Sequence, residues 1–310
     1  MQSKRVDEKV MENQVNIVTH NRSFHIDELM AIALLKVYYL GGKDVKITRT
    51  REEQELSVAV ADKDTFVIDV GFNYNPDILN FDHHQKGCDV KWKCGTPMSS
   101  CGMIWNWLKS QNIFQQKMND EMVKAIEERL IKPIDKHDNG IAGFEQAEFL
   151  MLYNRNNHDE AIMSRQFNRA LEAAIDFYHN LFSFIKNELK DKKEIDKALN
   201  KYKDLPYVVF DRNMKDAAKI SCSHKNKMLM IVPHSKGKWT IQAVPESKNR
   251  LFTQRCSFPE EVRGKDRKAL SKIQGMEKFL FVHKNGFMGV IEASKEEAIQ
   301  YAEILIKISR

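Results

Sequence analysis

The chain has 310 residues, of which 42% are hydrophobic, so it can bury a sizeable core, and its length suggests about two domains. No apolar run reaches the roughly 18 residues that a membrane-spanning helix needs. The charged start of the chain, residues 1–13, also lacks the apolar segment of a secretory signal. These features exclude a helical membrane protein and predict a soluble, intracellular protein, which we expect in the cytoplasm.

The formal net charge of +6 is unevenly distributed. Residues 206–310 hold 20 Lys and Arg against 11 Asp and Glu, whereas the rest of the chain holds 29 against 32. An acidic part that binds metal ions, joined to a basic part, suits a polyanionic substrate. Ordinary lysine-rich solubility is the alternative, and charge alone does not decide between the two.

The first third of the chain alternates between predicted strands and helices. The predicted strands are residues 15–20, 45–50 and 66–70, and the predicted helices are residues 27–40 and 51–61. This β-α-β-α-β order indicates a parallel sheet with right-handed crossovers.

Helix is predicted for most of the following region. The expected helices are residues 101–108, 120–130 with a stop near Pro133, and a long amphipathic stretch over 159–203. Residues 186–203 of that stretch have the composition of an exposed connecting helix. Pro206 is the predicted domain boundary, which gives domains 1–205 and 206–310.

The remaining residues form a predicted α+β region. A first strand at 207–210 precedes two hairpins, 228–232 with 239–244 and 279–283 with 288–291, and a closing helix over 295–308. The fold class is therefore α/β, with a parallel-sheet N-terminal domain that carries a helical insertion and a smaller α+β C-terminal domain.

Five cysteines occur in the chain, and none forms a C-x-x-C pair. The odd number and the spacing are typical of reduced thiols. A zinc site at Cys88, Cys94 and Cys101 is the alternative, but the spacing does not match the usual zinc patterns.

Four separate segments each supply His or Asp, and at least two of them lie just after a predicted strand. Because ligands gather beyond the carboxyl ends of strands in open α/β sheets, we expect these segments to converge on a metal site. A mixed set of imidazoles and carboxylates suits Mn²⁺ or a similar ion, and two such ions about 3.5–4 Å apart can clamp a phosphoryl group. The candidate ligands are His20, His25, Asp27, Asp69, His83 and Asp138, with Asp135 in reserve.

Each of these acids also has an ordinary structural interpretation. Asp69 alone could cap a helix at the end of its strand. Asp135 and Asp138 could form a helix cap before the turn at Asn139 and Gly140, although one of the two is the expected ligand, with Asp138 favoured. His137 lies between them and is not included among the ligands.

The ordered set of motifs resembles the DHH phosphoesterase superfamily and, within it, the melanocyte-proliferating-gene exonuclease family. The matching segments in the first part of the chain are residues 19–28, 67–71, 74–76, 81–85 and 135–140, and those in the last part are 257–260, 263–264, 275 and 281–287. Two positions depart from the pattern. Val262 stands where the family usually has Trp, which weakens a stacking contact. His25 stands where most of the wider superfamily has Asp, although the narrower family also uses His.

The resemblance implies a role for each matched residue. His20, His25 and Asp27 would hold one divalent ion, Mn²⁺ rather than Mg²⁺ by expectation. Asp69 would bridge two ions, and His83 with Asp138 would complete the second. Asp82 would orient a neighbouring imidazole, and His84 would face the phosphate as a hydrogen-bond donor or general acid. The reaction implied is the hydrolysis of single-stranded RNA or DNA from a 3′ end.

The basic C-terminal region supplies the candidate substrate contacts, which are Arg255, Arg263, His283 and Gly286. An arginine suits bidentate phosphate contact, and a glycine at a turn lets backbone N–H groups approach a phosphate. A solvated basic face and a simple hairpin turn are the alternatives. Two rival functions also remain open: hydrolysis of a small substrate such as pyrophosphate, a cyclic dinucleotide or a short oligonucleotide, and non-catalytic binding of nucleic acid.

Overall fold

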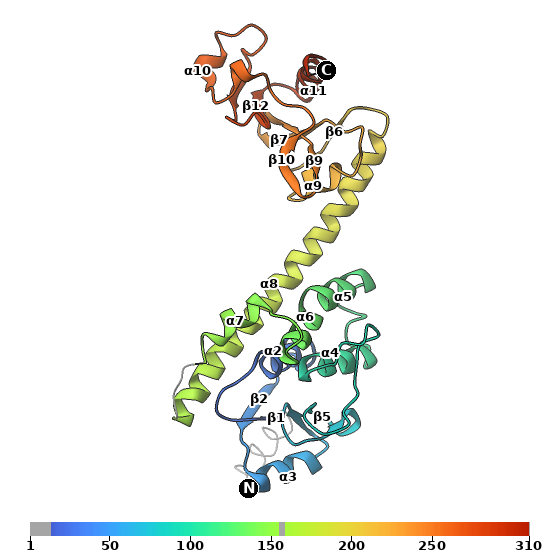
Figure 1. Ribbon diagram of the computed structural model, residues 1–310, viewed down its shortest axis with the longest axis vertical. Coiled ribbons are helices and arrows are strands. Elements are labelled where there is room, and N and C mark those ends of the chain that lie inside the picture. Colours follow the sequence, from blue (N-terminus) through green and yellow to red (C-terminus); the bar gives the residue numbers. More distant parts are fainter. Residues whose placement is uncertain (1–13, 155–158, 310) are drawn as a thin grey trace, which may run out of the picture. The chain divides into compact units, whose positions relative to one another are not determined.

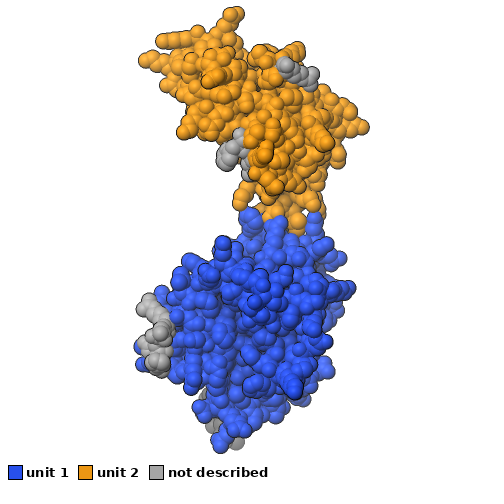
Figure 2. All heavy atoms as spheres, in the orientation of Figure 1, with its two compact units in different colours: residues 1–185 blue, residues 186–310 orange. Residues whose placement is uncertain are grey.

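The computed structural model describes residues 14–154 and 159–309 (Figure 1). The chain divides into two compact units, Met1–Ile185 and Lys186–Arg310 (Figure 2). The division falls inside the long helix α8 (Glu160–Lys201), and Pro206, the boundary suggested by the sequence, lies just beyond the end of that helix. Within the described ranges, no helix combines the length and the apolar character needed to cross a membrane.

The first unit is built on a mainly parallel sheet, as the sequence predicted. Its strands are β1 (Gln14–Thr19), β2 (Asp44–Arg49), β3 (Thr65–Ile68), β4 (Tyr74–Asn75) and β5 (Asn80–Phe81), in the spatial order β2-β1-β3-β5-β4. All neighbours pair in parallel except β4, which is antiparallel to β5. Strands of two residues are too short to show a hydrophobic alternation, so β4 and β5 were not predicted.

Helices make up most of the rest of the first unit (Figure 1). They are α2 (Ile26–Leu34), α3 (Glu53–Ala61), α4 (Ser100–Ser110), α5 (Asp120–Ile126), α6 (Lys132–Asp138), α7 (Glu145–Met151) and the first part of α8. Every residue of α2 is buried, which makes it the central helix of the unit. It continues into a π-helical segment at Leu35–Tyr39, which ends close to residue 40, the predicted end of this helix.

The prediction that a helix stops near Pro133 is wrong. A π-helical segment at Glu127–Ile131 joins α5 to α6, and α6 carries Pro133 in its first turn. The proline is tolerated there because the adjoining π-helical turn already departs from the regular i→i−4 hydrogen bonds of an α-helix.

The second unit is an α+β structure with a mainly antiparallel sheet. Its strands are β6 (Tyr207–Val209), β7 (Leu229–Ser235), β8 (Lys238–Ala243), β9 (Pro245–Ser247), β10 (Arg250–Gln254), β11 (Phe279–Val282) and β12 (Met288–Glu292), and its helices are α9 (Ala217–Ser221), α10 (Arg267–Leu270) and α11 (Lys295–Ile308). The main sheet has the order β11-β12-β8-β7-β6. Both predicted hairpins, β7 with β8 and β11 with β12, are confirmed.

The C-terminal part of α8 belongs to the core of this second unit. Ile195 and Leu199 are fully buried and share a hydrophobic cluster with Val208 and Met230. The interpretation of residues 186–203 as an exposed connecting helix is therefore wrong at these positions. Two apolar residues four apart on a lysine-rich helix are a weak signal in the sequence, yet that spacing places both on one face.

Candidate metal centre

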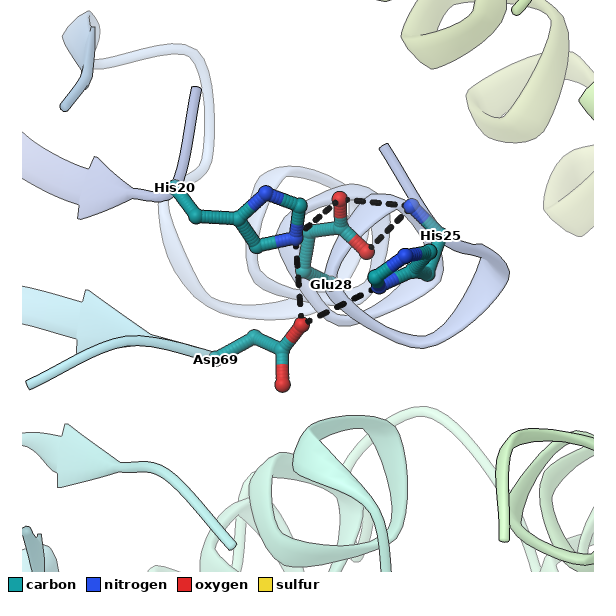
Figure 3. A group of neighbouring side chains, drawn as sticks. All are labelled: His20, His25, Glu28 and Asp69. Atoms are coloured by element: carbon teal, nitrogen blue, oxygen red, sulfur yellow. Dashed lines mark hydrogen bonds and ion pairs between the residues drawn. The ribbon is translucent and has the colours of Figure 1, made fainter. Parts of the chain in front are cut away.

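The first two candidate ligands lie at the carboxyl ends of neighbouring strands. β1 and β3 pair in parallel, so His20 after β1 and Asp69 after β3 meet at one edge of the sheet (Figure 3). Their side chains approach to 3.3 Å, from His20 Nε2 to Asp69 Oδ2. The backbone of Asp69 is left-handed, with φ of +57°, an uncommon conformation for a residue other than glycine. The chain therefore turns sharply at the residue whose carboxylate enters the site.

The beginning of α2 contributes three more side chains. His25 is the N-cap residue, and its backbone N–H donates to both carboxylate oxygens of Glu28 at 2.8 and 2.9 Å. The same Glu28 carboxylate lies 3.1 Å from His20 Nε2, as Figure 3 shows. Asp27, between them in sequence, is fully buried. The sequence alone does not identify Glu28 as a site residue, because a Glu three residues after an N-cap already has a role in a capping box.

The Asp82, His83 and His84 triplet follows β5, on the other side of Asp69. His83 Nε2 lies 3.2 Å from Asp69 Oδ1 and 3.3 Å from Asp138 Oδ2. His84 Nδ1 is 2.8 Å from Asp82 Oδ1 and 3.6 Å from Asp69 Oδ1. The two oxygens of Asp69 therefore face two different groups of histidines, with His20 and His25 on the Oδ2 side and His83 and His84 on the Oδ1 side.

The N-terminus of α4 holds the carboxylates in place. The backbone N–H of Ser100 donates to Asp27 Oδ2 at 3.2 Å, and the Ser100 hydroxyl donates to Asp69 Oδ1 at 3.2 Å. The positive end of the helix dipole also favours negative charge at this point. Ser100 is a second site residue that the sequence did not reveal, since a pair of serines before an apolar run looks like an ordinary helix start.

Asp135 serves the structure of the fold, and Asp138 is the acid beside the histidines. The Asp135 carboxylate accepts hydrogen bonds from Ser99, from the Gly102 N–H and from the Trp92 indole. A Cβ atom on Gly102 would lie only 2.1 Å from Asp135 Oδ2, so the helix can approach this acid only because it has a glycine there. Burial raises the pKa of Asp135 to about 7, against the opposing effect of these hydrogen bonds.

The charged groups of the cluster compete for protons. Burial opposes a charge on His20, but Asp69 and Glu28 outweigh it and raise the pKa of His20 to about 10. Burial and the nearby charges of Asp69 and Asp138 raise the pKa of Asp27 well above its usual range. Burial acts in the same direction on Asp69, yet its ion pairs with His20, His25 and His83 hold its pKa well below the ordinary value. The site thus holds more carboxylate charge than its own histidines neutralise.

A divalent ion fits this arrangement. Three buried polar atoms in the described part of the chain lack a hydrogen-bond partner and point into the cluster: His20 Nε2, Asp27 Oδ1 and Asp69 Oδ2. Three sets of ligand-type atoms lie within 4.8 Å of one another, and they are His20, His25, Glu28 and Asp69; Asp69, His83 and His84; and His25, Asp27 and Asp138. Imidazoles with carboxylates are a donor set that Mn²⁺ and similar ions accept.

The candidate substrate residues of the second unit have structural partners of their own. The Arg255 guanidinium donates to the backbone carbonyls of Cys222, His224 and Lys227. Arg263 Nε donates to the Phe258 carbonyl at 2.8 Å.

Gly286 and His283 shape the turn beside Arg263. A Cβ atom on Gly286 would lie 2.5 Å from Arg263 Nε, so Gly286 makes room for the arginine side chain. His283 Nδ1 accepts the Asn285 N–H at 3.1 Å. Arg263, His283 and Gly286 thus lie around one turn. Arg255 instead holds the segment that follows α9 through its hydrogen bonds to three carbonyls of that segment.

Fold and site together define a class: a mixed α/β protein with a histidine and carboxylate centre at the carboxyl edge of a parallel sheet. A family model named MYG1_exonuc and described as "Uncharacterised protein family (UPF0160)" matches residues 16–306. The chain belongs to this family, which confirms the resemblance drawn from the sequence.

Relatives of similar length extend this match. The "MYG1 protein" of Dictyostelium discoideum is 28% identical, over 89% of this chain and 92% of its own length. The "MYG1 exonuclease" of Homo sapiens is 25% identical, over 88% of this chain and 81% of its own. A solved structure of "exonuclease RecJ bound to manganese" aligns over 99% of this chain and 94% of its own at 10% identity, with a TM-score of 0.28. That score is too low to support an argument, so the assignment depends on the family match.

Proposed function

We propose that the chain is a metal-dependent phosphodiester hydrolase that removes nucleotides from the 3′ end of single-stranded RNA or DNA. The observation that carries the proposal is the position of Asp69, whose two carboxylate oxygens face separate groups of histidines. A carboxylate in that position suits a bridge between two divalent ions. Relatives bearing the name exonuclease support the reaction class.

The ligands divide between two ion sites. His20, His25 and Asp27 would hold one ion, His83 and Asp138 would hold the other, and Asp69 would contact both. Divalent ions supply charge neutralisation on the phosphoryl oxygens and acidify an attacking water molecule. We favour Mn²⁺ over Mg²⁺, because Mg²⁺ binds almost exclusively to oxygen ligands.

His84 is placed to act on the leaving group. Asp82 accepts a hydrogen bond from its Nδ1, and this contact, against the effect of burial, raises the pKa of His84. About half of the imidazole is exposed, which leaves Nε2 available to a substrate. A protonated Nε2 would donate its proton to the leaving oxygen as the P–O bond breaks.

The second unit would hold the rest of the strand. Its excess of basic residues over 206–310 favours binding to a polyanion. Arg263, His283 and Gly286 lie around one turn and are the proposed phosphate contacts, with Arg255 assigned to support this unit. We place the reaction in the cytoplasm, where the five free cysteines would stay reduced.

Hydrolysis of end-labelled oligonucleotides tests the proposal. Purified protein with Mn²⁺ should shorten single-stranded RNA or DNA progressively from the 3′ end, and a chelator should stop the reaction. His84→Ala should abolish the activity, whereas His179→Ala, which removes an exposed histidine of α8, should leave it unchanged. Equal activity of His84→Ala and the wild type, or no hydrolysis with any divalent ion, would refute the proposal. Shortening from the 5′ end would overturn the assigned direction.

A further inference from the structure

A pocket of about 330 Å³ opens beside the metal centre, and its lining is of two kinds. Polar groups of the centre, including His25, Asp69 and His84, line part of it. Leu56, Val70 and Phe72 also line it. Phosphate chemistry makes no use of apolar lining residues, so these three residues require a different explanation.

Phe72 is the most unusual of these three apolar residues. It is 73% exposed, and its backbone is left-handed, with φ of +52°, a conformation that bulky residues rarely adopt. An exposed aromatic ring in a strained backbone conformation has no benefit for folding, and such strain is concentrated at functional sites.

Hydrogen bonding and packing hold the backbone at Phe72 in place, although its side chain is exposed. Its backbone N–H donates to Asp82 Oδ2 at 2.6 Å, and the other oxygen of that carboxylate accepts from His84. The preceding Gly71 has no room for a side chain, since a Cβ atom would lie 2.8 Å from Val60 Cγ2. One carboxylate therefore fixes both the proposed proton donor and the segment that presents the ring.

Arg51 adds a positive charge to the same pocket. Its Nη1 donates to the backbone and side-chain oxygens of Asn21, the residue after His20. The pocket consequently offers an aromatic face, a guanidinium and a metal-binding edge within one small volume. These are the groups that recognise a base and a phosphate.

We propose that this pocket receives the terminal nucleotide of the substrate, with its base stacked on the ring of Phe72. The inference depends on the proposed function and specifies how that site holds its substrate. The volume lies at the lower end of the range of about 300–1,000 Å³ typical of small-ligand sites, which suits one nucleotide rather than several. Because every base has an aromatic face, Phe72 would bind the end of a strand without selecting its sequence.

Oligonucleotides that end in either 2-aminopurine or an abasic residue test this inference. Stacking on an aromatic side chain is worth about 5- to 150-fold in affinity. Phe72→Ala should therefore raise KM by that factor on the 2-aminopurine end and leave KM unchanged on the abasic end. Binding should quench 2-aminopurine fluorescence in the wild type and not in Phe72→Ala. Phe149→Ala, which removes another strongly exposed phenylalanine from α7, should change neither measurement.

Phe72→Gly guards against misfolding, because glycine adopts the left-handed conformation without strain. It should fold at least as stably as the wild type and still lose the stacking. An equal effect of the substitutions on base-bearing and abasic ends, or unchanged fluorescence quenching, would overturn the inference and leave the proposed function standing. Wild-type protein that hydrolyses neither oligonucleotide would instead overturn the proposed function.

Discussion

The two units use charged side chains in opposite ways. In the first unit, His20, Asp27 and Asp69 face one another and leave buried polar atoms without hydrogen-bond partners among the described residues. In the second unit, Arg255 and Lys227 each donate to several backbone carbonyls. A charged group whose hydrogen bonds are made within the fold supports the structure, whereas a charged group with buried, unpartnered atoms marks a binding site. The residue type alone does not distinguish the two.

Lys227 shows how complete such support is. Its side chain is fully buried, and Nζ donates to the carbonyls of Tyr202, Lys203 and Leu205, just beyond the C-terminal end of α8. A buried ammonium group is stable only when it is hydrogen-bonded, and these carbonyls supply three acceptors. Lys227 therefore contributes to the positive balance of the region without being available to a polyanion.

Removal of the shared carboxylate gives the largest effect that the comparison predicts. Asp69→Asn should lower kcat/KM for an oligonucleotide by about 1,000-fold, or about 4 kcal/mol, because a neutral amide cannot contact two ions as a carboxylate does. Steady-state kinetics with Mn²⁺ measure this. Asp64→Asn, an exposed acid of the preceding loop, should behave like the wild type. Comparable activity in the two variants would show that Asp69 is not shared between ions.

The sequence was sufficient for the features that depend on order and periodicity. The alternation of strands and helices predicted the parallel sheet, and the position of His20 and Asp69 after their strands predicted that they would meet. Glu28 and Ser100 escaped prediction because each also has an ordinary role at a helix start, and only packing brings them to the cluster. Phe72 escaped because nothing in a sequence shows a left-handed backbone or the absence of a covering side chain.

The same reasoning explains why Arg255 was placed among the candidate substrate contacts. A basic residue in a basic region looks the same in sequence whether it faces solvent or backbone carbonyls. The Asp135 and Asp138 alternative is similar, since both acids lie on α6, and the hydrogen bonds from Ser99 and Gly102 distinguish them. Pro133 misled the helix assignment because π-helical segments have no strong sequence signature.

Loss of the buried lysine should weaken the second unit without a direct effect on the metal centre. Lys227→Met should lower the free energy of unfolding of that unit by about 3 kcal/mol, because the carbonyls of Tyr202, Lys203 and Leu205 lose a charged donor. Denaturant unfolding followed by Trp239 fluorescence, in variants that lack the other tryptophans, reports on this unit. Lys225→Met, an exposed neighbour, is the matched control and should change stability by less than about 0.5 kcal/mol. A stable Lys227→Met protein would remove the contrast between the two units.

Substitution of Glu28 tests whether this carboxylate holds the histidine ligands of the metal centre in position. Glu28→Gln should weaken Mn²⁺ binding by about 10- to 100-fold, the usual cost of losing a group that positions a ligand. In the wild type, both carboxylate oxygens of Glu28 accept from the His25 N–H, and the negative charge lies beside His20. The amide of glutamine has one oxygen and no charge, so it cannot make all of these contacts. Isothermal titration with Mn²⁺ measures the affinity, and Glu53→Gln on the exposed side of α3 is the control. An unchanged affinity would limit Glu28 to its capping role.

The smallest expected effect is the pH dependence of stability that Asp135 contributes as a buried structural carboxyl next to the metal centre. Burial raises its pKa to about 7 in the folded protein, above the 3.8 of an exposed carboxyl. Between these values the folded state holds a proton that the unfolded state has released, so stability falls as pH rises. From pH 6 to pH 7 this group should remove about 1 kcal/mol. Urea unfolding in chelator should show that loss in the wild type beyond any shown by Asp135→Asn, which cannot titrate there. Parallel pH profiles would mean that the four hydrogen bonds to Asp135 keep it ionised throughout, as a permanent negative cap on α4.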